Sequence, residues 1–294
     1  KLESEWRCLS ETPDAFPWNV MPCTTRLRYM NNNKPLLSIG HMTYLNSEVF
    51  YWRLSKTSFN LVPMPPRAMA AALERGDLAA GPLPIAEILR MNGQVRSLGN
   101  LGVSSHGAAK SVFLFSRVPV EKLSGRNVAV TSHTATSIQL LRVLFNDFWK
   151  VSDHQFVGVD CSHEAALWIG DPALELRSSS DYDFIYDLGT AWTTLTDKPF
   201  VFAEWVVRND VPLEQAYELE TQLIKATKEG LRNIDEISRF RANHFLTELD
   251  VSDYVRNFSY FLGDNERSGQ MDFQRRLDQL PVWRPDSQAV GSLR

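Results

Sequence analysis

From Leu36 onward the chain alternates short β-type runs with helix-type runs, and this alternation leaves few folds open to it. Strands are predicted at 36–40, 59–62 and 77–82, and helices at 45–54 and 68–75. The third run is interpreted as leaving the sheet at a Gly-Pro turn, and Gly76 as closing the second helix. Strands that alternate with helices are typical of an α/β domain. The first part of the chain therefore predicts one half of a doubly wound lobe.

Two longer extended segments, 111–116 and 200–207, enclose a second set of α/β elements. This set has predicted strands at 127–130, 155–159, 166–169 and 184–188, and a predicted helix at 136–148. A lobe inserted between two extended segments implies that the chain crosses a hinge twice. We therefore expect an α/β protein of two lobes, each a doubly wound mixed sheet, with the ligand in the cleft between them.

The last third of the chain has a helical pattern. One predicted helix starts after Pro212 and breaks at Gly230, another covers 251–262, and both are expected to pack on the first lobe. The residues before the first strand have no regular period, and Met30 reads like a translation start. The predicted organisation is an N-terminal extension at 1–35, a discontinuous lobe 1 at 36–116 and 205–280, a lobe 2 at 117–204 and an irregular tail at 281–294.

Charge and composition exclude several classes of partner. The 294 residues include 31 Lys+Arg and 35 Asp+Glu, so the chain lacks the basic surplus of a nucleic-acid-binding protein. No apolar run reaches the ~18 residues of a membrane helix, and no signal-peptide pattern opens the chain. Three cysteines without CxxC spacing argue against a disulfide framework. We therefore expect a cytoplasmic protein with no nucleic-acid and no membrane partner.

The motifs that mark common cofactor-dependent and metal-dependent enzymes are absent from the sequence. There is no GxGxxG dinucleotide turn, no GxxxxGK[ST] phosphate loop and no GxSxG nucleophile elbow. His163-Glu164 begins like the helix of a zinc protease, but Leu167 occupies the position of the second histidine. The sequence therefore predicts no metal site and no cofactor.

Small polar residues gather instead at the ends of predicted strands. Tyr44-Leu45-Asn46-Ser47 follows the first strand, which places Asn46 near a helix N-terminus that faces the cleft. The alternative is that Asn46 only caps this helix. Thr131 to Ser137 joins a strand to the next helix, and its N–H groups and hydroxyls suit a carboxylate or phosphate. A plain capping box is the alternative for this second segment.

Two further polar residues lie where the chain is expected to cross between lobes or to leave a strand. Ser111 begins the long segment 111–116 and is expected at the hinge, facing the cleft. Asp171 follows Ile169-Gly170 at the end of a strand of the second lobe, where it either contacts the ligand or braces the loop. The predicted site therefore consists mainly of uncharged donors.

Six segments carry a resemblance to a known family. They are Ser38 to Asn46 (SIGHMTYLN), Ser104 to Ser116 (SSHGAAKSVFLFS), Thr131 to Ser137 (TSHTATS), Ile169 to Asp171 (IGD), Tyr186 to Trp192 (YDLGTAW) and Pro199 to Trp205 (PFVFAEW). In this order, over about residues 36 to 275, they resemble the chorismate dehydratase family of the futalosine route to menaquinone. The resemblance implies a two-lobed fold like that of type II periplasmic binding proteins, in a protein that works in the cytoplasm.

The resemblance also implies a reaction and a set of site residues. Family members convert chorismate to 3-[(1-carboxyvinyl)oxy]benzoate and water, and the enolpyruvyl carboxylate of the substrate has been proposed as the base. Asn46 matches the site asparagine of the family, so we expect it to orient the enolpyruvyl group or the departing hydroxyl as a catalytic residue. The expected substrate-binding residues are Tyr44, Ser111, Thr134, Ala135 (through its backbone N–H), Thr136 and Asp171.

Several positions depart from the family pattern. Pro84 stands where serine or threonine is usual, Thr134 replaces a common serine, and His106 stands where an acidic or small residue is common. His133 adds a titratable group beside the site, with a solvent-exposed loop histidine as the alternative interpretation.

The departures leave other functions open. One is a non-catalytic protein that binds a small aromatic or hydroxylated carboxylate on the same fold, and another is a later enzyme of the same pathway that shares the fold. The opening Tyr-Leu-Asn and the Thr-Ala-Thr-Ser segment favour the dehydratase over that later enzyme. The apolar C-terminal helices either pack internally or form the face of a homodimer.

Overall fold

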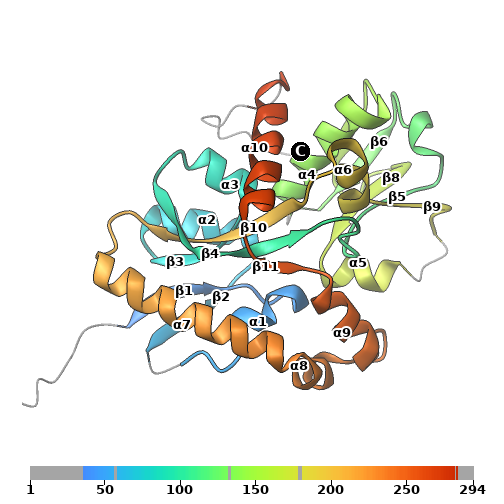
Figure 1. Ribbon diagram of the computed structural model, residues 1–294. Coiled ribbons are helices and arrows are strands. Elements are labelled where there is room, and N and C mark those ends of the chain that lie inside the picture. The colour runs from blue at the N-terminus through green and yellow to red at the C-terminus, as the bar shows by residue number, and fades with distance from the viewer. Residues whose placement is uncertain (1–35, 56–57, 132–133, 178–180, 282, 284–294) are drawn as a thin grey trace, which may run out of the picture. The chain divides into compact units, whose positions relative to one another are not determined.

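The computed structural model describes residues 36–55, 58–131, 134–177, 181–281 and 283, and Figure 1 shows its ribbon. The predicted extension at 1–35 and the tail beyond 283 lie outside the described residues. Over the described part, the chain forms two mixed β-sheets with helices packed around them. No helix in these ranges is both long and apolar enough to cross a lipid bilayer.

The first sheet has six strands in the order β11-β4-β10-β3-β1-β2. They are β1 (Leu37–His41), β2 (Phe59–Pro63), β3 (Ala80–Pro84), β4 (Val95–Ser105), β10 (Phe200–Arg208) and β11 (Ser259–Phe261). β1 pairs in parallel with β2 and β3, β10 runs antiparallel to β3 and β4, and β11 runs antiparallel to β4. Because β1 and β3 are parallel, their carboxyl ends lie at the same edge of the sheet, and the segments that leave them meet there.

The second sheet has five strands in the order β7-β6-β8-β5-β9. They are β5 (Val112–Ser116), β6 (Asn127–Val130), β7 (Gln155–Val157), β8 (Ala165–Ile169) and β9 (Phe184–Asp187). β5 is antiparallel to β8 and β9, and β6 is parallel to β7 and β8. The expectation of an α/β fold with two mixed sheets is confirmed. The lobe boundaries at 116/117 and 204/205 stay a prediction, with β5 bonded in the second sheet and all of β10 in the first.

The chain passes between the sheets twice, from β4 to β5 and from α6 (Leu188–Thr196) to β10. The carboxylate of Asp187 accepts hydrogen bonds from the N–H groups of Ala109 at 2.8 Å and Lys110 at 2.7 Å on the first crossing segment. It also accepts one from the N–H of Thr190 at 3.0 Å and thereby caps α6. One carboxylate therefore fixes both the first crossing and the helix that precedes the second.

Helices of the first half and of the C-terminal part surround the first sheet: α1 (Glu48–Tyr51), α2 (Pro66–Arg75), α3 (Ile85–Arg90), α7 (Leu213–Arg232), α8 (Ile234–Arg241) and α9 (Glu248–Arg256). Figure 1 shows α7 running beside α1. The fully buried ring of Phe50 in α1 meets Trp205 of β10 edge-on at 5.9 Å and Tyr260 of β11 at 5.5 Å. These aromatic contacts attach the helical layer to the sheet.

The second sheet packs against α4 (Thr136–Leu144), a π-helical turn (Phe145–Trp149), α5 (Asp171–Leu176) and α6. The last helix, α10 (Asp264–Asp278), packs against β10 and α4 (Figure 1, red). Its buried Phe273 lies 6.0 Å from the ring of Trp192 in α6 and 4.9 Å from that of Phe200. Helices α7 to α9 therefore pack on the first sheet, as expected for the C-terminal helices. α10 differs, because it also packs into the core of the second sheet.

Two predicted breaks are continuous structure instead. α7 runs through Gly230, where a Cβ would come within 2.6 Å of the carbonyl oxygen of Val49, so this glycine permits a close contact with α1 rather than ending a helix. The Gly81-Pro82 pair lies inside β3 rather than in a turn. On one side of β3, the pairing with β1 extends only as far as Ala80. Pro82 lies beyond this pairing, so β1 does not need the N–H group that Pro82 lacks.

The edge of the first sheet also differs from the expectation. The predicted helix at 251–262 ends at Arg256, and Ser259–Phe261 instead adds a strand to β4. β4 itself was not predicted, because Gly99 and Asn100 adopt positive φ angles of 65° and 50° in its middle and interrupt the β alternation.

Candidate functional site

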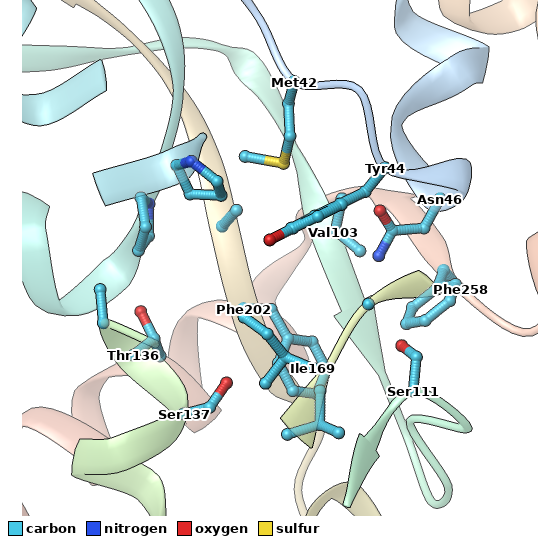
Figure 2. Close-up of a pocket in the computed structure, with 16 residues that line it drawn as sticks. Met42, Tyr44, Asn46, Val103, Ser111, Thr136, Ser137, Ile169, Phe202 and Phe258 are labelled. Atoms are coloured by element: carbon cyan, nitrogen blue, oxygen red, sulfur yellow. The ribbon is translucent and has the colours of Figure 1, made fainter. Parts of the chain in front are cut away.

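A pocket opens between the two sheets, and Figure 2 shows the residues that line it. It encloses about 600 Å³ including its mouth. The first-sheet side contributes Met42, Tyr44, Asn46, Pro66, Pro84, Val103, Phe202, Ala203 and Phe258. The second-sheet side contributes Ser111, Val112, Ala135, Thr136, Ser137, Ile169 and Gly170. Both sheets therefore supply the wall of one cavity.

Asn46 reaches the pocket from the segment that leaves β1. This segment forms the 3-10 turn η1 (Leu45–Ser47), in which the cap position is held by Tyr44 and not by Asn46. The Oδ1 atom of Asn46 accepts a hydrogen bond from Ser47 Oγ at 3.3 Å, and Figure 2 shows the amide group turned toward the cavity. The structure therefore does not use Asn46 as a helix cap, and its amide N–H groups face the pocket.

Asp171 lies behind this segment and is not among the residues that line the pocket. Its Oδ1 accepts a hydrogen bond from the N–H of Leu45 at 3.2 Å, and its Oδ2 accepts one from Arg241 Nη2, also at 3.2 Å. Arg241 also donates to the carbonyl oxygen of Thr43 and to Glu48. Of the two interpretations that the sequence left open, the geometry supports a brace: Asp171 and Arg241 hold the segment that carries Tyr44 and Asn46.

Burial has opposite effects on the two partners of this brace. It raises the pKa of the Asp171 carboxyl, an effect that the hydrogen bond from Leu45 only partly offsets, and it lowers the pKa of Arg241. Burial and the nearby Asp171 charge also raise the pKa of Tyr44. The Tyr44 hydroxyl therefore keeps its proton and faces the pocket as a hydrogen-bond donor.

The first turn of α4 forms the opposite side of the pocket. Ala135 and Thr136 line the cavity, whereas Thr134 does not. The Oγ1 of Thr134 donates to the carbonyl oxygen of Thr131 at 2.9 Å, which stabilises its own loop. The Oγ1 of Thr136 accepts a hydrogen bond from the N–H of Ala86 at 3.1 Å, so its own proton is left to donate. The N–H groups that open a helix, with its dipole, favour an anion at this point.

Ser111 enters the pocket from the first crossing segment. It is buried, with 2% of its surface exposed, and its Oγ accepts a hydrogen bond from the hydroxyl of Tyr254 at 2.6 Å. Its carbonyl oxygen accepts the N–H of Gly170 at 2.8 Å, which ties the start of β5 to the end of β8. Figure 2 shows Asn46 and Ser111 on one side of the cavity and Thr136 and Ser137 on the other. Uncharged donors therefore face one another across the pocket.

Gly170 leaves room for the ring of Tyr44 at the wall of the pocket. Its φ angle is +67°, and a Cβ at this position would lie 3.2 Å from the ring of Tyr44. A side chain would therefore be strained by the backbone and would also push against that ring. In this segment Ile169 therefore lines the pocket, Gly170 permits close contact with Tyr44, and Asp171 braces the backbone at Leu45.

The remaining singled-out residues contribute little to the described pocket. His106 is exposed and lies 3.9 Å from Asp197, outside the pocket lining. His133 lies outside the described residues. Pro84 does line the pocket, without a hydroxyl to offer. In the ranges that the structure describes, no group of three or more His, Cys, Asp or Glu is placed to hold a metal ion.

Sequence reasoning missed the apolar part of the pocket. Phe202 and Phe258 pack edge-to-face at 6.4 Å, and both line the cavity with Ile169 and Val103. The nearly continuous apolar run 200–207 predicts the strand that carries Phe202, but it does not show which face of that strand meets a ligand. The sequence predicts Phe258 within a helix, but this helix ends two residues earlier, at Arg256. An apolar, partly aromatic floor between polar walls suits a small ring that carries anionic groups.

Comparisons with known proteins agree with this architecture. Among solved structures, the AF1704 protein of Archaeoglobus fulgidus matches with a TM-score of 0.68 at 11% identity, over 84% of this chain and 98% of that one. The alkanesulfonate-binding protein SsuA of Xanthomonas axonopodis pv. citri, bound to MOPS, matches with a TM-score of 0.58 at 15% identity, over 83% of this chain and 91% of that one. At these identities the matches show the fold alone, and the expected binding-protein-like fold is confirmed.

Sequence comparisons carry the assignment further. A curated chorismate dehydratase of Thermus thermophilus is 25% identical over 259 residues, which cover 81% of this chain and 94% of the relative. A family model described as menaquinone biosynthesis matches residues 37–279. The expected family and the expected dehydratase type of enzyme are confirmed by these two matches together. Since the family model spans nearly the whole described structure, the chain belongs to the menaquinone biosynthesis family.

Proposed function

We propose that this protein is a chorismate dehydratase, which converts chorismate to 3-[(1-carboxyvinyl)oxy]benzoate and water. The observation that carries the proposal is the donor set of the pocket. Asn46, Ser111, Thr136 and the start of α4 face one cavity, and none of the described lining residues bears a charged side chain. Such a site suits a small dianion, because neutral donors stabilise carboxylates without the cost of burying a charged side chain.

Positioning and fixed dipoles are the catalytic means that such a site offers. We assign the carboxylates of the substrate to Ser111, Thr136 and the backbone N–H of Ala135, which lie on the second-sheet side of the cavity. We assign the enolpyruvyl group or the departing hydroxyl to the amide of Asn46, which lies across the cavity from Thr136. The apolar floor that contains Phe202 then holds the ring.

The proton is removed by the substrate itself in this proposal. The described lining residues offer no carboxylate and no imidazole, whereas the enolpyruvyl carboxylate of chorismate lies next to the ring carbon that carries the ether. That carboxylate takes the proton from this carbon, and the C–H electron pair forms the new ring double bond. The C–O bond to the neighbouring hydroxyl breaks, and the hydroxyl receives the proton that the carboxylate has taken and leaves as water. The gain of aromatic character drives the step.

The test is a direct assay with purified protein. We expect chorismate to be consumed and the aromatic product to be detected by liquid chromatography and mass spectrometry, at a rate well above that of chorismate in buffer. Binding of chorismate by calorimetry without turnover would instead support the non-catalytic carboxylate-binding protein. Absence of both turnover and binding would contradict the proposal. A homodimeric state and a cytoplasmic location remain expectations alongside the proposed function.

A further inference from the structure

Helix α9 holds the first crossing segment at three points. Asn257, directly after the helix, donates to the carbonyl oxygen of Ala108 at 2.7 Å. Lys110 Nζ lies 3.5 Å from the carbonyl oxygen of Asp253. Between these two contacts, the hydroxyl of Tyr254 donates to Ser111 Oγ at 2.6 Å. In the first two contacts the acceptor is a backbone carbonyl oxygen. In the third, the acceptor is the side chain of Ser111, which lines the pocket.

The environment of Tyr254 determines the direction of its hydrogen bond. The residue is 4% exposed, and its ring packs edge-on against Phe258 at 5.2 Å. Burial raises the pKa of its phenol far above the ordinary value, more than the bond to Ser111 lowers it, so the hydroxyl keeps its proton. A phenol is a stronger hydrogen-bond donor than an aliphatic alcohol. Tyr254 therefore donates, and Ser111 accepts.

Because Ser111 accepts the hydrogen bond from Tyr254, its hydroxyl acts as a donor toward the cavity. A serine hydroxyl has one proton to donate, and a lone pair of Ser111 is occupied by Tyr254. The proton of Ser111 is then directed away from Tyr254, and the chain of two hydroxyls polarises it. Figure 2 shows the Ser111 oxygen turned toward the cavity.

We propose that Tyr254 is a positioning residue for the reaction: it holds the Ser111 hydroxyl as a donor to a carboxylate of the bound substrate. Tyr254 does not line the pocket, and its hydroxyl acts on the site through Ser111. The proposal rests on the proposed function for the identity of the substrate. The role of the hydrogen bond from Tyr254 to Ser111 requires only that the bound ligand carries a carboxylate.

The test is a double-mutant cycle with a matched control. Tyr254→Phe keeps the ring that packs on Phe258 and removes the hydroxyl, and we expect it to lower kcat/KM for chorismate by roughly tenfold. In a Ser111→Ala background the same change should have no further effect, since the group that it positions is gone. Tyr260→Phe is the control: this buried hydroxyl donates to the carbonyl oxygen of Val255, also in α9, and contacts no lining residue that the structure records. Tyr260→Phe should leave kcat/KM within about twofold of the parent.

A binding measurement distinguishes a failure of this proposal from a failure of the proposed function. The affinity for isophthalate, a non-reacting aromatic dicarboxylate, is measured by calorimetry for the same variants. If the parent protein does not turn over chorismate, the proposed function fails, and the cycle on isophthalate affinity still tests Tyr254. An unchanged kcat/KM and isophthalate affinity in Tyr254→Phe would overturn the proposal, as would an equal loss in the Ser111→Ala background. A parent protein that binds neither carboxylate would overturn it as well.

Discussion

The Oγ1 atom of Thr136 accepts a hydrogen bond from the backbone N–H of Ala86 at 3.1 Å, which joins the first turn of α4 to the first turn of α3. α3 starts after Pro84, a residue with no side-chain oxygen to cap it. Ala86 is the second residue of this helix, so its N–H is one that an N-cap side chain would normally accept. A threonine from the second-sheet side therefore caps a helix on the first-sheet side, at the wall of the pocket.

This cap predicts a loss of stability in Thr136→Val. The variant keeps the shape of the side chain but leaves the buried N–H of Ala86 without its acceptor, so we expect the free energy of unfolding to fall by about 1–3 kcal/mol. Thr136→Ser, which keeps the hydroxyl, should lose less. Urea unfolding followed by tryptophan fluorescence measures both. Adding Pro84→Ser to Thr136→Val supplies a local cap and should restore about 1 kcal/mol; no recovery would argue against the capping role.

Asn46→Ala should abolish most of the activity without unfolding the protein. The substitution removes the only amide side chain among the described lining residues, and we expect kcat/KM for chorismate to fall by about 100-fold. Asn60→Ala is a matched control, because exposed Asn60 in β2 contacts only Ser38 Oγ among the hydrogen bonds recorded for its side chain. A parent-like rate for Asn46→Ala would remove this residue from the mechanism.

The brace between Asp171 and Arg241 predicts coupled effects on catalysis. Asp171→Ala removes the acceptor of the Leu45 N–H, and Arg241→Met removes the donor to Thr43 and Glu48, so each should let the Asn46 segment shift. We expect each to lower kcat by roughly tenfold and the double variant to lose no more than either. Steady-state kinetics check this. A rise in KM confined to Asp171→Ala would indicate direct substrate contact by Asp171 instead.

Gly170→Ala should destabilise the protein and disturb the pocket. Its positive φ costs about 1–3 kcal/mol for a residue with a side chain, and the new methyl group would press on the ring of Tyr44 at 3.2 Å. Gly158→Ala is the control, since a Cβ there meets no atom within 4 Å and its φ is ordinary. Thermal unfolding and isophthalate affinity are measured for both. Equal stability of the two variants would contradict the strain at Gly170.

Asp272 predicts an acid-sensitive contribution to stability. Burial opposes ionisation of this carboxyl, but the hydrogen bond from Arg275 and the charges of Arg276 and Lys198 outweigh it and lower its pKa. A lowered folded-state pKa contributes stability above the unfolded-state value, and this stability is lost as the pH falls through the folded-state pKa. We expect Asp272→Asn to lose about 1–3 kcal/mol at pH 7. The difference from the parent should shrink below about pH 4 in urea unfolding, and a constant difference would contradict the ionic origin.

Local patterns were sufficient for most of the sheet-forming segments. β1, β2, β5, β6 and β10 lie where apolar runs predict strands, because such runs and the turns that flank them are properties of neighbouring residues. α2 ends at Arg75 and is closed by Gly76, which has a φ of +84°, as the sequence predicts. Local patterns failed at β4, where Gly99 and Asn100 break the alternation, and at β11, where pairing with β4 outweighs a helical period.

The sequence by itself determined the α/β class, the polar strand ends and the family, since each depends on residue types read in order along the chain. The tertiary structure decided which of those residues meet. Tyr254 and Ser111 are 143 positions apart, and Asp171 and Leu45 are 126 apart, so no periodicity links either pair. Their contacts exist because segments of the two sheets pack around one pocket, and such long-range contacts depend on the burial of the whole core rather than on any local pattern.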